Sequence, residues 1–116
     1  MKITRVGITA DGGSHFEDVP VDLADLGPMG RLSEPWPATA VVFRESDLGT
    51  DLGWHCAPQR QLVVLLDGEI EVEVTSGEIR RFRGGDVLLV EDTAGAGHRT
   101  RTVGPGARRS LFIPVP

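Results

Sequence analysis

Apolar residues along the chain fall into short runs, and none keeps a helical spacing over several turns. The runs have the length and the β-branched content that strands favour. Glycine-containing turn signals, such as Asp67-Gly68 and Gly104–Gly106, separate several of them. The pattern predicts an all-β sandwich or small barrel, with at most one helical turn at Val21–Gly27. Strands are expected at Thr39–Glu45, Gln61–Leu66, Glu69–Val74, Asp86–Val90 and Ser110–Val115.

Asp67-Gly68 joins two of these runs and is typical of the two-residue turn that closes a β-hairpin. In such a hairpin Leu65 pairs with Ile70, and paired residues share a face. One face is then apolar except for Gln61, and we expect it to line the interior. Because a buried amide needs hydrogen-bond partners, Gln61 is a candidate to meet a ligand. This predicted inner face consists of Gln61, Val63, Leu65, Ile70, Val72 and Val74.

The other face of the first strand carries Leu62, Val64 and Leu66, three apolar side chains that need a cover. Residues 1–38 have a looser pattern that includes several prolines. We therefore expect an N-terminal extended arm, residues 1–38, and a β-barrel, residues 39–116. The arm could cover the apolar face within one chain or across a dimer. Soluble monomers rarely expose a contiguous apolar patch, so a homodimer is expected.

Composition narrows the classes of protein that fit. The chain has 116 residues, enough for one domain, and its net charge of −5 argues against binding to nucleic acid. A single cysteine, Cys56, excludes an internal disulfide and favours a reducing cytoplasm. No apolar run reaches the length of a signal peptide or a membrane span, so no membrane partner is expected.

The stretch Gly53–Val103 resembles the two motifs of the cupin family. The first motif is matched at His55 and Gly68, and the second at Gly85-Asp86 and His98. The resemblance implies a single antiparallel β-barrel, or double-sheet jelly roll, that holds a small molecule. The surroundings are similar to a subgroup of small bacterial cupins, at Asp11–Val19, Trp54–Pro58 and Glu91–Arg101.

The sequence departs from the family pattern at two ligand positions. Ala57 stands where a second histidine is usual, and Gln61 stands where a glutamate is usual. Cupin sites commonly bind iron, manganese, nickel or zinc through three histidines and one glutamate. The resemblance leaves His55, Gln61 and His98 as metal ligands here, a set that implies weak or partial occupancy. Glu91 and Asp92 precede His98 and could supply a carboxylate, although acids in a turn are usually solvated.

Without a metal, His55 and His98 remain candidate catalytic residues, because imidazoles exchange protons near neutral pH. Two further residues are candidates to bind substrate together with Gln61. His15 could join the site from the N-terminal arm, and Arg60 could hold a carboxylate at the mouth of the barrel. The alternatives are a surface histidine and a solvated arginine.

Two functions remain open. The first is an isomerase, cyclase or lyase that moves a proton on a carbonyl-bearing substrate, with the two histidines as base and acid or as ligands of a divalent ion. A dioxygenase is disfavoured, since the carboxylate of the iron-binding facial triad is missing. The second is a module that binds a small molecule without chemistry. Either way the expected partner is a small molecule.

Overall fold

The structure, a computed structural model, describes residues 1–47 and 49–116, and within them it consists of strands and one short 3-10 turn. The predicted all-β class is confirmed. The turn η1 (Gly27–Met29) begins at the last residue of Val21–Gly27, the segment in which one helical turn was expected. The strands are β1 (Lys2–Ile8), β2 (Ser14–Pro20), β3 (Ala24–Asp25), β4 (Arg31–Leu32), β5 (Val42–Ser46), β6 (Asp51–His55), β7 (Gln61–Leu65), β8 (Glu69–Glu73), β9 (Ile79–Arg83), β10 (Val87–Val90), β11 (His98–Val103) and β12 (Arg108–Pro114).

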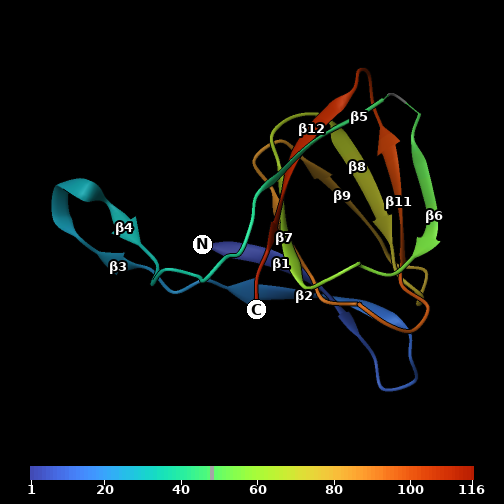
Figure 1. Cartoon of the computed structure of the whole chain (residues 1–116), viewed down its shortest axis with the longest axis horizontal. Coiled ribbons are helices and arrows are strands. Elements are labelled where there is room, and N and C mark those ends of the chain that lie inside the picture. The colour runs from blue at the N-terminus through green and yellow to red at the C-terminus, as the bar shows by residue number, and fades with distance from the viewer. Residues whose placement is uncertain (48) are drawn as a thin grey trace.

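Two sheets face each other and form a sandwich (Figure 1). The larger sheet has the strand order β2-β1-β10-β7-β12-β5, and the smaller one has the order β6-β11-β8-β9. The pair β1 and β10 is parallel, whereas the other strand pairs of the described residues are antiparallel. Within that part of the chain no strand pairing closes the two sheets into one barrel. Of the two expected forms, barrel or double-sheet jelly roll, the architecture is therefore the double-sheet form.

The predicted hairpin at Asp67-Gly68 is wrong in its pairing. β7 pairs with β10 and β12 in the larger sheet, whereas β8 pairs with β9 and β11 in the smaller one. The turn therefore carries the chain from one sheet to the other. Gly68, with a φ of 72°, lies so close to Arg108 of β12 that an added Cβ would be 2.6 Å from the Arg108 Cβ. This contact with β12 is a tertiary feature that the two turn residues do not encode.

The predicted inner face holds although the pairing does not. Leu65, Ile70, Val72 and Val74 are buried between the sheets, and Gln61 is buried with them. Both strands still alternate between inside and outside, so their inward side chains meet across the sandwich instead of side by side. The same core includes Val6, Phe16, Phe82 and Leu88.

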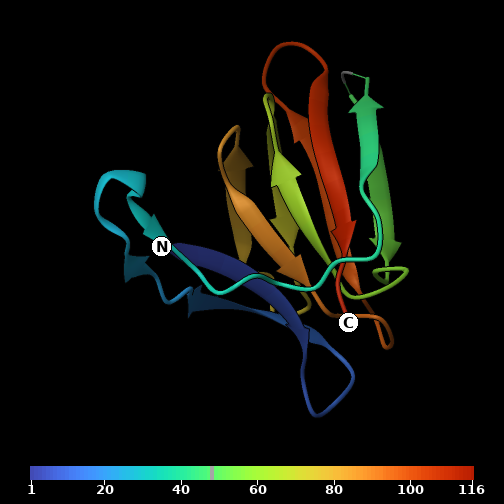
Figure 2. The ribbon, with the colours of Figure 1, turned by 60° about the vertical axis from the view of Figure 1, so that its left-hand side comes forward.

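The first 20 residues belong to the larger sheet, because β1 is hydrogen-bonded to β10. Their outer side forms a second apolar cluster, in which Leu62 packs with Ile3, Val19 and Leu89. The N-terminal strands thus cover part of the face that Leu62, Val64 and Leu66 were expected to expose, while Leu66 remains exposed. The β3–β4 hairpin projects away from the sandwich (Figures 1 and 2).

No helix in the described part of the chain is long and apolar enough to cross a membrane.

Candidate functional site

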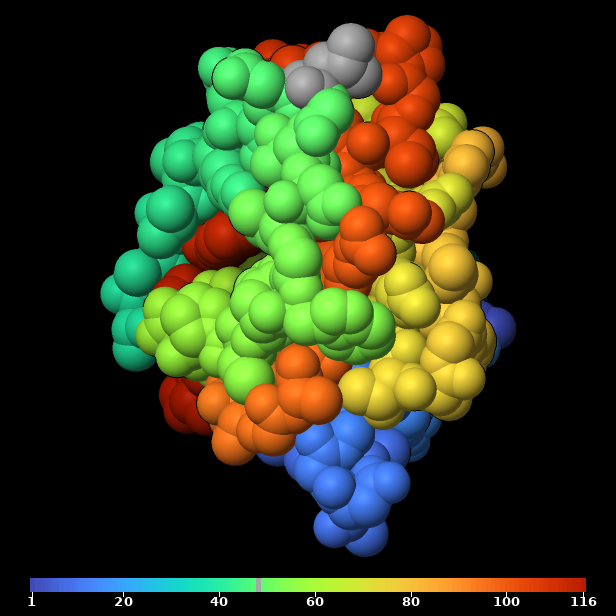
Figure 3. Space-filling model, turned by 90° about the vertical axis from the view of Figure 1, so that its right-hand side faces the viewer, coloured from blue at the N-terminus to red at the C-terminus, as the bar shows by residue number. Residues whose placement is uncertain are grey.

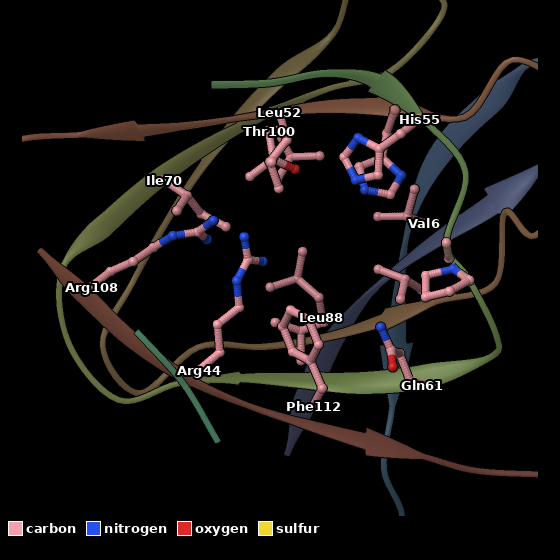
Figure 4. Close-up of a pocket in the computed structure, with 16 residues that line it drawn as sticks. Val6, Arg44, Leu52, His55, Gln61, Ile70, Leu88, Thr100, Arg108 and Phe112 are labelled. Carbon is pink, nitrogen blue, oxygen red and sulfur yellow. The ribbon is translucent and has the colours of Figure 1, made fainter. Parts of the chain in front are cut away.

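A cavity of about 230 Å³ lies between the two sheets, and both sheets contribute to its walls (Figure 4). Most of the wall is apolar, with side chains such as Val6, Ile70 and Leu88. Pockets for drug-sized ligands usually span ~300–1,000 Å³, so this cavity fits a smaller molecule. The polar residues of the wall are Arg44, His55, Gln61, His98, Thr100 and Arg108.

His55 and His98 are direct neighbours on the paired strands β6 and β11. Their ring centroids are 4.7 Å apart, with an angle of 56° between the ring planes. A bulge in β6 adds one residue between the pairs His55–His98 and Leu52–Thr100. The extra residue lets both Leu52 and His55 face the cavity, although strict alternation would turn one of them outward.

The loop before β11 brings His98 to this position. Gly97 has a φ of 74° and lies against the backbone of His55, with no room for a side chain between them. Its carbonyl oxygen also accepts a hydrogen bond from the Ser14 hydroxyl at 2.6 Å. Figure 3 shows this loop (orange) in contact with the segment that contains His55 (green), above the turn between β1 and β2 (blue). The loop and β6 therefore form one packed unit.

Asp92 holds the ring of His98 from behind. Its side chain is fully buried, and its Oδ2 accepts a hydrogen bond from the His98 Nδ1 at 2.5 Å. The backbone fixes Asp92 in turn, because its carbonyl oxygen accepts a hydrogen bond from the Ala57 amide at 3.1 Å. A carboxylate that accepts from Nδ1 keeps the proton on that nitrogen, so the neutral ring has a free lone pair on Nε2.

His55 is held in the same tautomer by a different acceptor. Its Nδ1 donates to the carbonyl oxygen of Gly53 at 2.7 Å, and a carbonyl can only accept. In the neutral state both rings therefore have Nε2 as the nitrogen without a proton. Two adjacent imidazoles of this kind can act as base and acid in turn, or can ligate a metal.

Gln61 lies on the wall formed by the larger sheet, on β7, and is 4% exposed. No side-chain hydrogen bond to its amide is present within residues 1–47 and 49–116. Figure 4 shows the amide on the side of the cavity opposite His55. The structure thus brings His55, Gln61 and His98 to one cavity, as the sequence predicted, without assigning them a role.

The donor groups of this cavity do not match a resident cupin metal. Two imidazoles converge, but no group of three or more His, Cys, Asp or Glu side chains does so in the described residues. Asp92, the nearby carboxylate, is already engaged with the Nδ1 of His98. Structural and catalytic metal sites usually supply at least three such ligands. No step of the chemistry proposed below passes through a metal.

Arg44 and Arg108 are cavity residues that the sequence did not single out. Arg108 of β12 is 3% exposed, and Arg44 of β5 is half-buried, with its guanidinium carbon 5.3 Å from the ring centre of Phe112. Burial, and then the charge of Arg44, lower the pKa of Arg108 to about 10. The signal was present in the sequence: extending the last predicted strand back to Arg108 puts this residue on the same face as Ser110 and Phe112.

The structure does not bring His15 or Arg60 to the cavity. The guanidinium of Arg60 pairs with Glu91 at 2.5 Å and donates to the carbonyl of Pro116. His15 is on β2, where its neighbour Phe16 enters the core and His15 itself is partly exposed, 3.9 Å from the Glu17 carboxylate. Of the two acids before His98, Glu91 is held by arginines and Asp92 is buried, so the expectation of a solvated pair was wrong.

No protein-family model and no curated protein matches the chain. Among solved structures, protein NMB1881 from Neisseria meningitidis is 20% identical, with a TM-score of 0.49 over 73% of this chain and 88% of that one. A Salmonella typhimurium protein that carries the name ethanolamine utilization protein Q is 16% identical, with a TM-score of 0.44 over 100% of this chain and 96% of that one. Neither likeness bears on what this chain binds or does.

Proposed function

We propose that the chain is a cupin-type enzyme that moves a proton on a small carbonyl-bearing substrate, as an isomerase, a cyclase or a lyase. The buried Asp92–His98 pair beside His55 is the observation that carries this proposal. A buried carboxylate that orients an imidazole is a familiar arrangement for a general base. We also propose a bacterial cytoplasmic location, on the basis of the family resemblance and the single cysteine.

In the proposed mechanism the Nε2 of His98 removes a proton from the carbon next to the substrate carbonyl. Asp92 stabilises the imidazolium that forms, because its carboxylate already accepts from Nδ1. His55, in its protonated form, donates from Nε2 to the carbonyl oxygen as negative charge develops there. Return of the proton to another carbon, ring closure, or loss of a leaving group gives the isomerase, cyclase or lyase.

The remaining walls of the cavity support this chemistry. The amide of Gln61 lines the cavity and makes no side-chain hydrogen bond in the described part of the chain, so it is free to donate to a substrate oxygen. The apolar side chains of Val6, Ile70 and Leu88 reduce contact between water and the reacting atoms. Charges that develop in such surroundings interact more strongly with the histidines than they would in water.

Solvent-exchange NMR tests the proposal without knowledge of the natural substrate. A panel of small ketones, aldehydes and 2-oxo acids is incubated with the protein in deuterium oxide, and loss of the proton next to the carbonyl is followed. The wild-type protein should accelerate exchange for at least one compound. His98→Gln and Asp92→Asn should slow that exchange by about 10²–10⁴-fold, the usual contribution of a positioned acid or base.

His15→Gln is the matched control, because it removes a histidine outside the cavity, and it should leave exchange unchanged. Asp92→Asn should also change the proton position on His98, which imidazole ¹⁵N NMR detects. If compounds of the panel bind in the cavity but none of them exchanges its proton, the result would contradict the proposed enzyme activity and favour a binding module. Equal exchange by wild type and His98→Gln would contradict the assigned base.

A further inference from the structure

Two arginines meet inside the cavity, on neighbouring strands of the larger sheet. Arg108 of β12 is paired with Ser46 of β5, and Ser110 is paired with Arg44, so the two arginines are diagonal neighbours on one face. Figure 4 shows both guanidinium groups pointing into the cavity, at the end away from His55. The cavity thus has an imidazole end and a guanidinium end.

No acidic side chain of residues 1–47 and 49–116 forms an ion pair with either of these two arginines. None of the residues that line the cavity is Asp or Glu, although acids outnumber bases in the whole chain. Acids close to the two strands lie on the outer surface: Glu45 of β5 is exposed, and Asp67, in the turn after β7, pairs with the outward Arg109 at 2.7 Å. Buried arginines elsewhere are normally paired with a carboxylate.

The polar atoms beside Arg108 also lack partners. Among residues 1–47 and 49–116, its buried Nε has no hydrogen-bond partner, and neither do the buried hydroxyls of Ser46 and Ser110 on adjoining positions of the same face. Arg44 lies against the ring of Phe112, which orients its guanidinium without neutralising it. Burial and mutual repulsion already lower the pKa of Arg108 to about 10, and an anion at this place would relieve both effects.

We propose that Arg44 and Arg108 bind the carboxylate of a small organic acid whose carbonyl end meets His55 and His98. This inference rests on the proposed function and names its substrate class. Guanidinium groups bind planar carboxylates through paired hydrogen bonds, and two of them fix the direction in which the molecule lies. The cavity of about 230 Å³ is large enough for an acid of a few carbon atoms.

Titration with a charged and an uncharged version of one molecule tests the proposal. Pyruvate and its neutral amide, pyruvamide, are titrated separately into the wild-type protein, with binding followed by amide ¹H–¹⁵N NMR, and inorganic phosphate provides a second anion. Pyruvate should bind at millimolar concentration and shift the amides of β5 and β12, while pyruvamide binds at least about tenfold more weakly. Phosphate that binds more tightly than pyruvate would overturn the carboxylate class.

Variants identify the residues responsible. Arg108→Met and Arg44→Gln should each weaken pyruvate binding about tenfold or more, since each removes a charged donor. Arg44 is half-buried, so Arg44→Gln remains informative if Arg108→Met fails to fold. Arg109→Gln is the matched control on the outer face of β12 and should leave pyruvate affinity unchanged. Unchanged affinity in both cavity variants, equal binding of pyruvamide, or no detectable pyruvate binding would overturn the proposal.

The result separates this inference from the proposed function. If pyruvate binding depends on the arginines but no compound exchanges its proton, the carboxylate site is supported and the proposed enzyme activity is contradicted. If neutral ketones exchange their protons as fast as 2-oxo acids do, and exchange is equally fast in Arg44→Gln, the proposed enzyme activity is supported and the carboxylate site is contradicted.

Discussion

The backbone of Gly97 lies against the carbonyl group of His55 so closely that a Cβ added to Gly97 would be 2.1 Å from that carbonyl oxygen. Real Cβ atoms essentially never approach so closely, and the atom in the way is rigid backbone. The contact fixes the distance between β6 and the residue before His98. It is therefore a condition for the pairing of the two imidazoles.

We predict that Gly97→Ala separates the two histidines. The left-handed backbone at this glycine costs about 1–2 kcal/mol for any other residue, and the overlap with His55 adds to that cost. Urea denaturation should show a loss of more than about 2 kcal/mol, and proton exchange should fall with it. Gly77→Ala is the control, because Gly77 also has a positive φ but has no atom within 4 Å of its added Cβ. Equal losses in the two variants would contradict the packing argument.

Arg108 should destabilise the ligand-free protein. Its folded-state pKa of about 10 lies below the ordinary value of an arginine, so at neutral pH the folded state carries an unfavourable charge that the unfolded chain solvates freely. Arg108→Met should raise the free energy of unfolding by about 1–3 kcal/mol, because it replaces a buried unpaired charge with an apolar side chain of similar length. Urea denaturation at neutral pH measures this gain. A less stable variant would show that Arg108 is stabilised by a contact that the account lacks.

The lowered pKa also predicts the sign of the dependence on pH. Wild type should gain stability relative to Arg108→Met as the pH rises above about 10, since the folded protein releases the Arg108 proton before the unfolded chain does.

We propose that a divalent ion binds the histidine pair only weakly. Two imidazoles are fewer ligands than stable sites supply, and Gln61 offers a neutral oxygen. Gln61→Glu adds a carboxylate to the same cavity and should tighten zinc or nickel binding by about tenfold or more in a calorimetric titration. His15→Gln should have no effect on the same titration. Unchanged affinity in Gln61→Glu would mean that position 61 is not a ligand position.

We also propose that the chain forms a homodimer through the projecting β3–β4 hairpin. Leu26, Met29 and Leu32 on this hairpin are exposed, Met29 by 74%, and few contacts hold the hairpin to its own sandwich. Light scattering at micromolar concentration should give twice the mass of one chain. The double variant Leu26→Ser with Met29→Ser should give the mass of a single chain. Ile79→Ser, which changes an exposed residue of β9, is the control. A monomeric wild type would contradict the proposal.

The inner face was predictable because alternation is local. Gln61 and Leu65 share a parity within β7, and Ile70 and Val72 share one within β8; each parity holds whatever the strand pairs with. The pairing of β7 with β10 and β12 was not predictable, since Asp67-Gly68 can close a hairpin or cross between sheets. Which of these occurs depends on strands distant in the sequence.

The two arginines were missed for a related reason. Phe43 and Arg44 are adjacent, and hydrophobicity alone would turn Phe43 inward, yet Phe43 is 80% exposed and Arg44 lines the cavity. Tertiary pairing with β12 decides the orientation of this edge strand. Asp92 was considered only as a carboxylate in a turn, because its burial depends on contacts with Ala57 and His98 that no local pattern encodes.

The most direct test of the account is the position of the proton on His98. Asp92 holds this proton on Nδ1, so that the Nε2 of the neutral ring carries a free lone pair for the substrate. Imidazole ¹⁵N NMR on the neutral ring, in wild type and in Asp92→Asn, measures this directly. We predict a protonated Nδ1 and an unprotonated Nε2 in wild type, and a shift away from that tautomer in Asp92→Asn. A proton on Nε2 in the wild-type protein would contradict the account.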